Sequence, residues 1–324
     1  MKIQSWRVPI LLFVEAVIIV LLLVLPASEW LNILVSLFMV LLAYLLWWWM
    51  KRVVYSRFEQ THPLFKHLPW KKIAIGVMLG IGTVLLIIGL IWIFNGFSEG
   101  SGYKSFATAN PEIVARRSPA NAATRYMKNI GSALLIYAHS ALGEELLFRV
   151  VGMGLPVMLV FWLVFGRKKR TDALGTDKKK AWRTWLLIGT IANVLVAVAF
   201  GLFHSGSPGW TVVPMLNITL SGLLYGQLFV LQGNLLGAWA MHWLWNVTQA
   251  ALGLPVSGRL AADGPLVAVG FQGARDGILS GGQYGPEGSI IAVVVQAVIL
   301  VALVKIAWQS VRPQRRIENG EKRS

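Results

Sequence analysis

Hydrophobic residues gather along the chain in long runs, which shorter polar and charged segments separate. Several runs reach the roughly 18–20 residues that a helix needs to cross a bilayer core of about 30 Å. The pattern predicts eight spans, at Val8–Leu25, Trp30–Met50, Ile73–Phe94, Ile130–Phe165, Trp185–His204, Val212–Leu231, Leu235–Leu254 and Ile290–Trp308. The ten-residue segments of alternating apolar and polar residues that mark a membrane β-barrel are absent from the sequence. We therefore expect an all-α, polytopic helical membrane protein with its site between helices of the bundle.

The region Ile130–Phe165 decides the span count, because it is too long for one straight crossing. Gly152, Gly154 and Pro156 predict a break within it. If the region crosses once, the two strongly basic loops and both chain ends lie on one side, which the positive-inside bias makes cytoplasmic. If it crosses twice, there are nine spans and the basic loop Arg167–Arg183 moves outside. Eight spans are favoured, with the amino and carboxyl termini in the cytoplasm.

Composition agrees with this class of protein. Of the 324 residues, 56% are hydrophobic and 14% charged, and the net charge is +16. The Lys and Arg residues cluster between apolar runs, so they indicate orientation in a lipid bilayer and no nucleic-acid partner. The chain has no cysteine, which excludes thiolate metal sites and a cysteine nucleophile. Short loops and no organellar targeting segment favour a bacterial cytoplasmic (inner) membrane, and the pattern carries no signal for an oligomeric state.

We divide the chain into three segments. Residues 1–129 hold the first membrane helices and loops, and residues 130–254 form the expected catalytic core. Residues 255–324 hold a Gly-rich loop, the last span and a basic tail.

Few acidic or histidine side chains lie inside the apolar runs, and such residues are functional candidates because charge at membrane depth is costly. They are Glu15, His139, Glu144, Glu145, His204 and His242. Glu15 and His139 belong to no recognisable pattern, so we interpret both as structural or tuning residues.

Glu144 and Glu145 lie next to each other, and Arg149 follows one helical turn after Glu145. On a helix, Glu145 and Arg149 share a face and can form an ion pair. Glu144 points about 100° away and can face a cavity as a general base. The alternative is an ion-pair network that only joins helices.

Two further pairs lie on later spans. Phe200 precedes His204 by one turn, and His242 precedes Asn246 by one turn. Both His242 and Asn246 can donate hydrogen bonds, so together they could hold a developing oxyanion. The alternative is a polar contact between helices.

Together the three patterns resemble a known family. Glu144-Glu145-x-x-x-Arg149, Phe200-x-x-x-His204 and His242-x-x-x-Asn246 look like the motifs of the CPBP intramembrane proteases, which include the type II CAAX prenyl endopeptidases and bacteriocin self-immunity proteins. The resemblance covers roughly residues 130 to 250. It implies an intramembrane endopeptidase acting on a membrane protein or peptide, with eight spans in its core.

The resemblance also implies roles for single residues. Glu144 and His204 would activate water, and His242 and Asn246 would stabilise the oxyanion, while Glu145, Arg149 and Phe200 would support the site. We expect no metal or other cofactor; if zinc is used, its ligands would be Glu144, His204 and His242. The family commonly has glycine after the motif arginine, where this chain has Val150. The insertion between Arg149 and Trp185 is also unusual.

Two readings from other classes stay open at this point. A transporter could use buried Glu, His and Arg to relay protons, and a non-catalytic immunity or scaffold protein could retain the motifs. The peptidase reading itself meets a difficulty of depth. Straight helices starting at one surface would separate His204 and His242 by about 18 Å along the membrane normal.

Overall fold

The structure is a computed structural model of the chain, and it describes residues 69–95, 122–157, 160, 178–259 and 277–309. The chain divides into two units, Met1–Trp48 and Trp49–Ser324, and every described residue belongs to the second. The first two predicted spans and Glu15 therefore lie outside the described residues. The division at residues 129 and 254 stays a prediction.

The described part of the chain is helical and contains no β-strand, only an isolated bridge between Val256 and Arg259. Its long α-helices are α4 (Pro69–Asn95), α7 (Ala122–Glu145), α9 (Lys178–Phe203), α10 (Val212–Gln232), α11 (Leu236–Ala251) and α13 (Ile290–Gln309). Short elements are the π-helix η4 (Leu146–Gly154), α12 (Gly277–Ser280) and the 3₁₀ turns η6 (Gly282–Tyr284) and η7 (Pro286–Gly288). The predicted all-α fold is confirmed for these residues.

Four described helices are long and apolar enough to cross a membrane, at Trp70–Phe94, Trp182–Phe203, Val212–Gln232 and Ile290–Gln309. They correspond to four of the predicted spans. The helix expected at Leu235–Leu254 is the 16-residue α11, which is short for a complete crossing. The protein is therefore a helical membrane protein, while the count of eight spans stays a prediction.

Small residues allow the helices that carry the site to pack closely. A Cβ atom on Gly80 of α4 would lie 2.6 Å from the Met241 carbonyl oxygen of α11, so only glycine fits there. Gly222 of α10 faces Ala197 of α9 in the same way, with a Cβ separation of 3.2 Å. These contacts hold α11 against α4, and α9 against α10, along their backbones.

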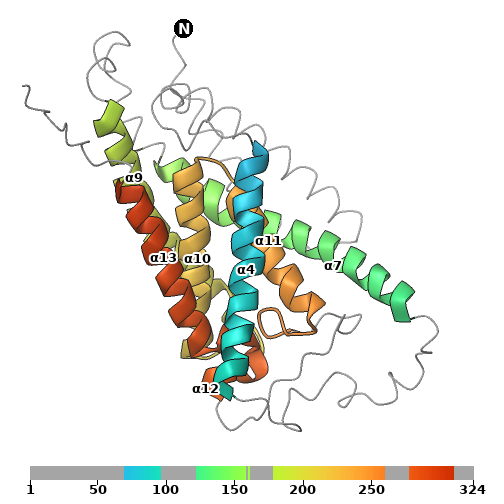
Figure 1. Cartoon of the computed structure of the whole chain (residues 1–324). Helices are drawn as coiled ribbons and strands as arrows, with labels where there is room; N and C mark the ends of the chain where they lie inside the picture. The colour runs from blue at the N-terminus through green and yellow to red at the C-terminus, as the bar shows by residue number, and fades with distance from the viewer. Residues whose placement is uncertain (1–68, 96–121, 158–159, 161–177, 260–276, 310–324) are drawn as a thin grey trace, which may run out of the picture. The chain divides into compact units, whose positions relative to one another are not determined.

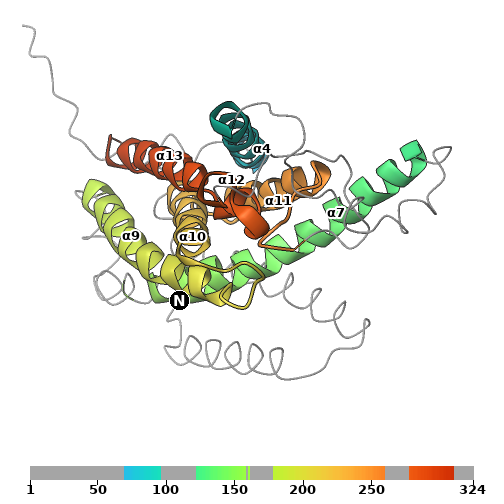
Figure 2. The same ribbon diagram turned by 90° about the horizontal axis from the view of Figure 1, so that it is seen from below.

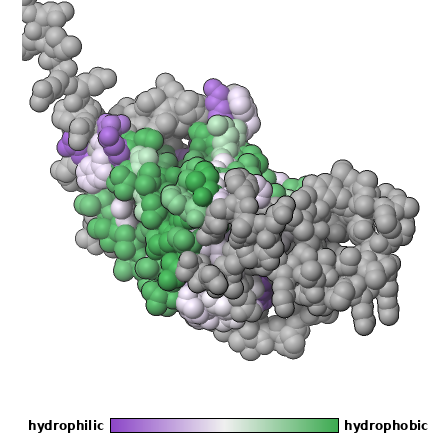
Figure 3. Space-filling model, turned by 60° about the horizontal axis from the view of Figure 1, so that its bottom comes forward, coloured by the Kyte–Doolittle hydropathy of each residue, from purple (hydrophilic) through white to green (hydrophobic). Residues whose placement is uncertain are grey.

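Apolar side chains also cover part of the outer surface. Leu195 and Val198 of α9 and Val298 and Val301 of α13 are exposed, as lipid-facing residues would be. Figure 3 shows hydrophobic residues gathered continuously over one face of the described part. We conclude that this face meets lipid.

Helix α7 differs from the others in direction. In Figures 1 and 2 it runs obliquely to α4 and α10. Two stacked indoles of α11 hold it: Trp239 Nε1 donates to the Ala138 carbonyl oxygen, and Trp243 Nε1 donates to that of Leu134, both at 2.9 Å. Carbonyls on one face of α7 are thereby fixed to α11.

The predicted break at Gly152, Gly154 and Pro156 is wrong in position and kind. The α-helix gives way to the π-helix η4 already at Leu146, directly after Glu145, and helical structure continues through Val157. Instead of breaking the helix, the chain adds wider turns: the Leu155 N–H donates to the Val150 carbonyl, five residues back. Single π segments inside helices are common at functional sites.

Candidate active site

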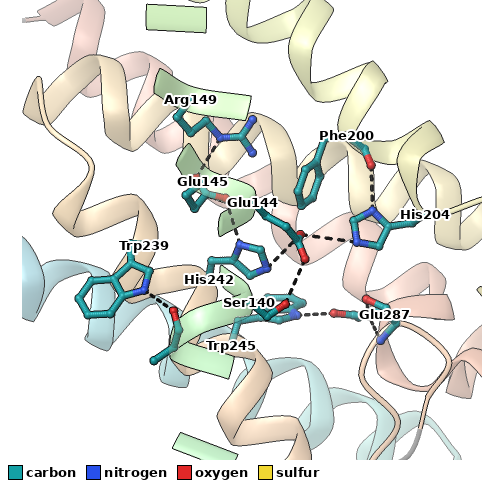
Figure 4. A network of polar contacts seen from close by, with 12 residues as sticks. Ser140, Glu144, Glu145, Arg149, Phe200, His204, Trp239, His242, Trp245 and Glu287 are labelled. Atoms are coloured by element: carbon teal, nitrogen blue, oxygen red, sulfur yellow. Dashed lines mark hydrogen bonds and ion pairs between the residues drawn. The ribbon is translucent and has the colours of Figure 1, made fainter. Parts of the chain in front are cut away.

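The three sequence patterns meet at one place in the fold (Figure 4). Glu144 and Glu145 end α7, and Arg149 follows in η4. Phe200 lies in the last turn of α9 and His204 comes directly after that helix, while His242 and Asn246 lie in α11. The side chains come from three segments that are far apart in the sequence.

Glu145 and Arg149 form the predicted ion pair, with Arg149 Nε donating to Glu145 Oε2 at 3.0 Å. Both side chains are fully buried. The other Glu145 oxygen, Oε1, lies 3.0 Å from His242 Nδ1. Because the paired carboxylate accepts hydrogen bonds, His242 Nδ1 carries a proton and donates it. Glu145 therefore joins η4 to α11 and also orients the His242 ring.

His204 is oriented by its own helix. Its Nδ1 lies 2.9 Å from the Phe200 carbonyl oxygen, which can only accept. The proton of a neutral His204 thus sits on Nδ1, and Nε2 presents its lone pair on the other side of the ring. The same hydrogen bond explains why Phe200 and His204 lie one turn apart.

Glu144 faces both histidines. Its Oε2 lies 3.8 Å from His204 Nε2 and 3.9 Å from His242 Nε2. Ser140 Oγ donates to Glu144 Oε1 at 3.3 Å, whereas the buried Oε2 has no hydrogen-bond partner among the described residues. The Glu144 side chain is 23% exposed, so this carboxylate keeps a route to the surroundings. One carboxylate oxygen and two imidazole nitrogens thus converge, each slightly too far apart for a direct hydrogen bond.

Aromatic rings enclose this group. Tyr225 of α10 stacks on the His242 ring at 4.7 Å, and the Phe200 ring lies 5.9 Å from it, edge to face. The Arg149 guanidinium carbon lies 5.1 Å from the Phe200 ring centroid, as in a cation–π contact. The rings fix the polar groups from several sides and lower the dielectric constant around them.

His204 and His242 lie close together, although straight helices would place them at different depths in the membrane. His204 follows the last residue of α9, and its ring packs back against Phe200 at 4.9 Å. Phe200 in turn touches His242. The hydrogen bond from His204 Nδ1 to the Phe200 carbonyl draws the ring back by one turn, to the level of Phe200. Helix position alone therefore overestimates the separation.

Asn246 is buried, at 7% exposed, one turn after His242 on α11. It makes no hydrogen bond with another described residue, so nothing there engages its amide. His139 is exposed on α7. Val150, which replaces the glycine common in the family, is buried within η4 at 6% exposed.

The sequence reasoning missed three residues near the site. Ser140 lies one turn before Glu144, a spacing that could have revealed it. Tyr225 lacks such a signal, because an aromatic residue in an apolar span is ordinary. Glu287 was passed over because it lies in the Gly-rich loop, yet it is buried and bonds to Trp245 of α11. Burial, and after it the Glu287 carboxylate, raise the pKa of the nearby Tyr284 hydroxyl above its ordinary value.

One carboxylate and two imidazoles form a donor set that zinc accepts. Across residues 69–95, 122–157 and the later described ranges, however, no group of three or more His, Cys, Asp or Glu is arranged to hold a metal ion. We derive no step through a metal.

Comparison with known proteins places this geometry in context. Residues 127–248 match the family described as type II CAAX prenyl endopeptidase Rce1-like. The CPBP family resemblance is confirmed. The matched segment begins in α7 and ends in α11, so it includes all three sequence patterns from Glu144 to Asn246. It supports a membrane-embedded protease that acts on membrane-associated peptides. No curated protein and no solved structure matches the chain.

Proposed function

We propose that this protein is an intramembrane endopeptidase in which Glu144 activates a water molecule to cleave a peptide bond. The observation that carries the proposal is the position of Glu144 Oε2. It is buried, and it faces two imidazole nitrogens at 3.8 and 3.9 Å. Polar atoms separated by more than 3.5 Å are suitably placed to share a bridging water.

The first step is deprotonation of the water. Held between Glu144 Oε2 and His204 Nε2, the water gives one proton to Glu144, and its oxygen attacks the carbonyl carbon of the scissile bond. The second O–H of the water stays intact and donates a hydrogen bond to His204 Nε2, which has a free lone pair because the His204 proton lies on Nδ1 against the Phe200 carbonyl. The Glu144 proton then passes to the leaving amide nitrogen, and the C–N bond breaks with one water consumed.

The second requirement is stabilisation of the oxyanion. The carboxylates of Glu144 and Glu145 and the guanidinium of Arg149 together leave one negative charge, which a protonated His242 would balance. Its Nδ1–H donates to Glu145, so its Nε2–H can donate to the oxyanion beside the Asn246 amide. Glu145 and Arg149 hold this donor in place.

We propose a mechanism without a metal, with zinc held by Glu144, His204 and His242 as the version to be tested. Cleavage unchanged by a strong chelator such as 1,10-phenanthroline, together with less than stoichiometric metal in the purified protein, is the expected result. Loss of cleavage that added zinc restores would favour the zinc version.

The substrate we propose is a membrane-associated protein or peptide. We place the protease itself in a bacterial cytoplasmic membrane, with both of its ends in the cytoplasm. The proton-transporter reading has no observation of its own in its favour, while the family match favours the peptidase.

Mapping of protein termini in cell membranes tests this proposal. Membranes from cells producing the wild type and Glu144→Ala would be labelled at free amino termini and analysed by mass spectrometry. We expect new termini that depend on the wild-type protein. A synthetic peptide with a C-terminal CAAX sequence, with and without a farnesyl group, then tests whether a prenyl group is required. Identical sets of termini in both membranes would contradict the proposal.

A further inference from the structure

Glu287, in the turn η7 before α13, is a buried carboxylate that the proposed mechanism does not use. Its Oε1 accepts hydrogen bonds from Trp245 Nε1 at 2.6 Å and from Gln249 Nε2 at 3.0 Å. Its Oε2 accepts from the Ser257 backbone N–H at 2.7 Å and from the Ser257 hydroxyl at 3.3 Å. At 2% exposed, this carboxylate depends on these donors in place of water.

Two of the donors belong to the helix that carries half of the site. Trp245 and Gln249 lie one turn apart on α11, and Trp245 directly precedes Asn246. The bond from Trp245 to Glu287 therefore fixes the rotation of α11, the helix that also carries His242. Figure 4 shows Trp245 and Glu287 beside the cluster of Glu144 and the two histidines.

The other donor leads to the turn that follows His204. Ser257 adopts a left-handed backbone with φ 49°, which places its N–H on Glu287. The next residue, Gly258, leaves no room for a Cβ atom because the Pro208 carbonyl lies against it. Gly258 also donates to the Tyr284 carbonyl at 3.2 Å. The Ser257–Gly258 turn thus supports the chain four residues beyond His204.

A second contact holds the turn that follows His204. The Trp210 ring lies 6.2 Å from the Tyr284 ring, and Tyr284 is itself buried in the turn next to Glu287. The segment after His204 is therefore held by the Ser257–Gly258 turn and by Tyr284, which both lie next to Glu287. The α11 helix is held by Glu287 itself.

We propose that Glu287 is a positioning residue, which fixes the turn after His204 against α11 so that both Nε2 atoms face Glu144. This inference rests on the proposed function, because it assigns Glu287 to the alignment of that site. Glu287 touches none of the reacting groups. Loss of the Glu287 carboxylate would disturb the alignment of the catalytic groups, and misplacement by about 1 Å can cost on the order of 100-fold in rate.

Steady-state kinetics with Glu287→Gln are the first test. The variant keeps the volume, but its NH₂ group replaces one acceptor oxygen and faces donors. The probe is a peptide containing a cleavage sequence mapped in the membranes. We expect kcat to fall at least tenfold while KM stays within about twofold, because groups that misalign lose transition-state contacts. Trp245→Phe removes one donor only and should give a smaller loss of kcat.

Gln296→Leu is the matched control. Gln296 of α13 is also fully buried, and it bonds to Ser221 Oγ at 3.0 Å and to Asn217 Oδ1 at 2.7 Å on α10. This substitution breaks a comparable buried network that does not reach the turn after His204. We expect it to lower the unfolding temperature as much as Glu287→Gln does, with kcat retained.

A distance measurement tests the positioning without any substrate. The chain has no cysteine, so two spin labels can be attached to one double variant, Ile136→Cys on α7 and Ser205→Cys beside His204. Both positions are exposed. The distance distribution should be narrow in the otherwise wild-type protein, broader in Glu287→Gln and in Trp245→Phe, and unchanged in Gln296→Leu.

The two arms separate the failure of this inference from failure of the proposed function. A wild-type protein that cleaves nothing would defeat the proposed function, and the spin-label arm would still decide the positioning role. An unchanged distance distribution in both Glu287→Gln and Trp245→Phe would overturn that role. So would an equal loss of kcat in Gln296→Leu.

Discussion

At the scale of single residues, two adjacent carboxylates have different surroundings and therefore different roles. Glu145 is fully buried and bonded to both Arg149 and His242. Glu144 is partly exposed, and its only hydrogen bond within the described chain comes from Ser140. A buried, fully bonded carboxylate is a brace, while a carboxylate with an unsatisfied oxygen is available for chemistry.

Matched glutamine variants should separate these roles. Glu144→Gln removes the base, and we expect cleavage to fall by about 10²–10⁴-fold with little change in stability. Glu145→Gln leaves Arg149 buried without its counter-charge. Breaking a buried ion pair from one side costs on the order of 3–5 kcal/mol, so the unfolding temperature should fall together with activity. Thermal unfolding in detergent and cleavage rates measure both, and equal stability losses would refute the division.

Gly143 offers a way to test the approach to Glu144. A Cβ atom at Gly143, the residue before Glu144, would meet nothing within 4 Å, so a larger side chain has room there. We expect Gly143→Leu to raise KM at least tenfold by obstructing substrate, with Gly143→Ala close to wild type. Equal kinetic constants in Gly143→Leu and wild type would show that substrate arrives from another side.

At the scale of helices, close packing between α4 and α11 holds His242 and Asn246 in place. Gly80 faces the α11 backbone, whereas Gly82, on the same helix, has nothing within 4 Å of an added Cβ. The π-helix η4 and the two indole bonds to α7 fix the opposite side of the site.

Alanine at these two glycines should have opposite effects. Gly82→Ala gains helix propensity, worth about 0.5–1 kcal/mol, and should stabilise the protein. Gly80→Ala forces α4 and α11 apart, so we expect a lower unfolding temperature and lost activity. Thermal unfolding of the two purified variants checks this, and a stabilised Gly80→Ala would contradict the close packing.

At the scale of the whole molecule, the number of spans and the side on which each terminus lies are predictions. One crossing by the region Ile130–Phe165 and eight spans place both termini in the cytoplasm. A fluorescent protein fused at the carboxyl terminus should therefore fluoresce, and a periplasmic phosphatase fused there should be inactive. Strong phosphatase activity would indicate an odd number of spans.

The pattern of hydrophobicity predicts the fold class and most of the site, because polar residues in apolar runs are few and stand out. Glu144, His204 and His242 were found in this way. The resemblance implies that His204 and His242 share a site, but their contact cannot be derived from the sequence, since a linear pattern contains no helix tilt or side-chain direction. The change to a π-helix at Leu146 has no residue signal. Glu287 was missed because a loop carboxylate is ordinarily solvated, and only the folded chain shows its donors.

Cleavage of one mapped peptide by purified protein in lipid vesicles tests the central claim most directly. Wild type would be compared with Glu144→Gln, His204→Ala and His242→Ala at equal amounts of folded protein. We predict that the wild type cleaves at a single bond and that each variant is slower by at least about 100-fold. Equal cleavage by all four proteins would contradict the assignment of Glu144, His204 and His242 to a shared catalytic site.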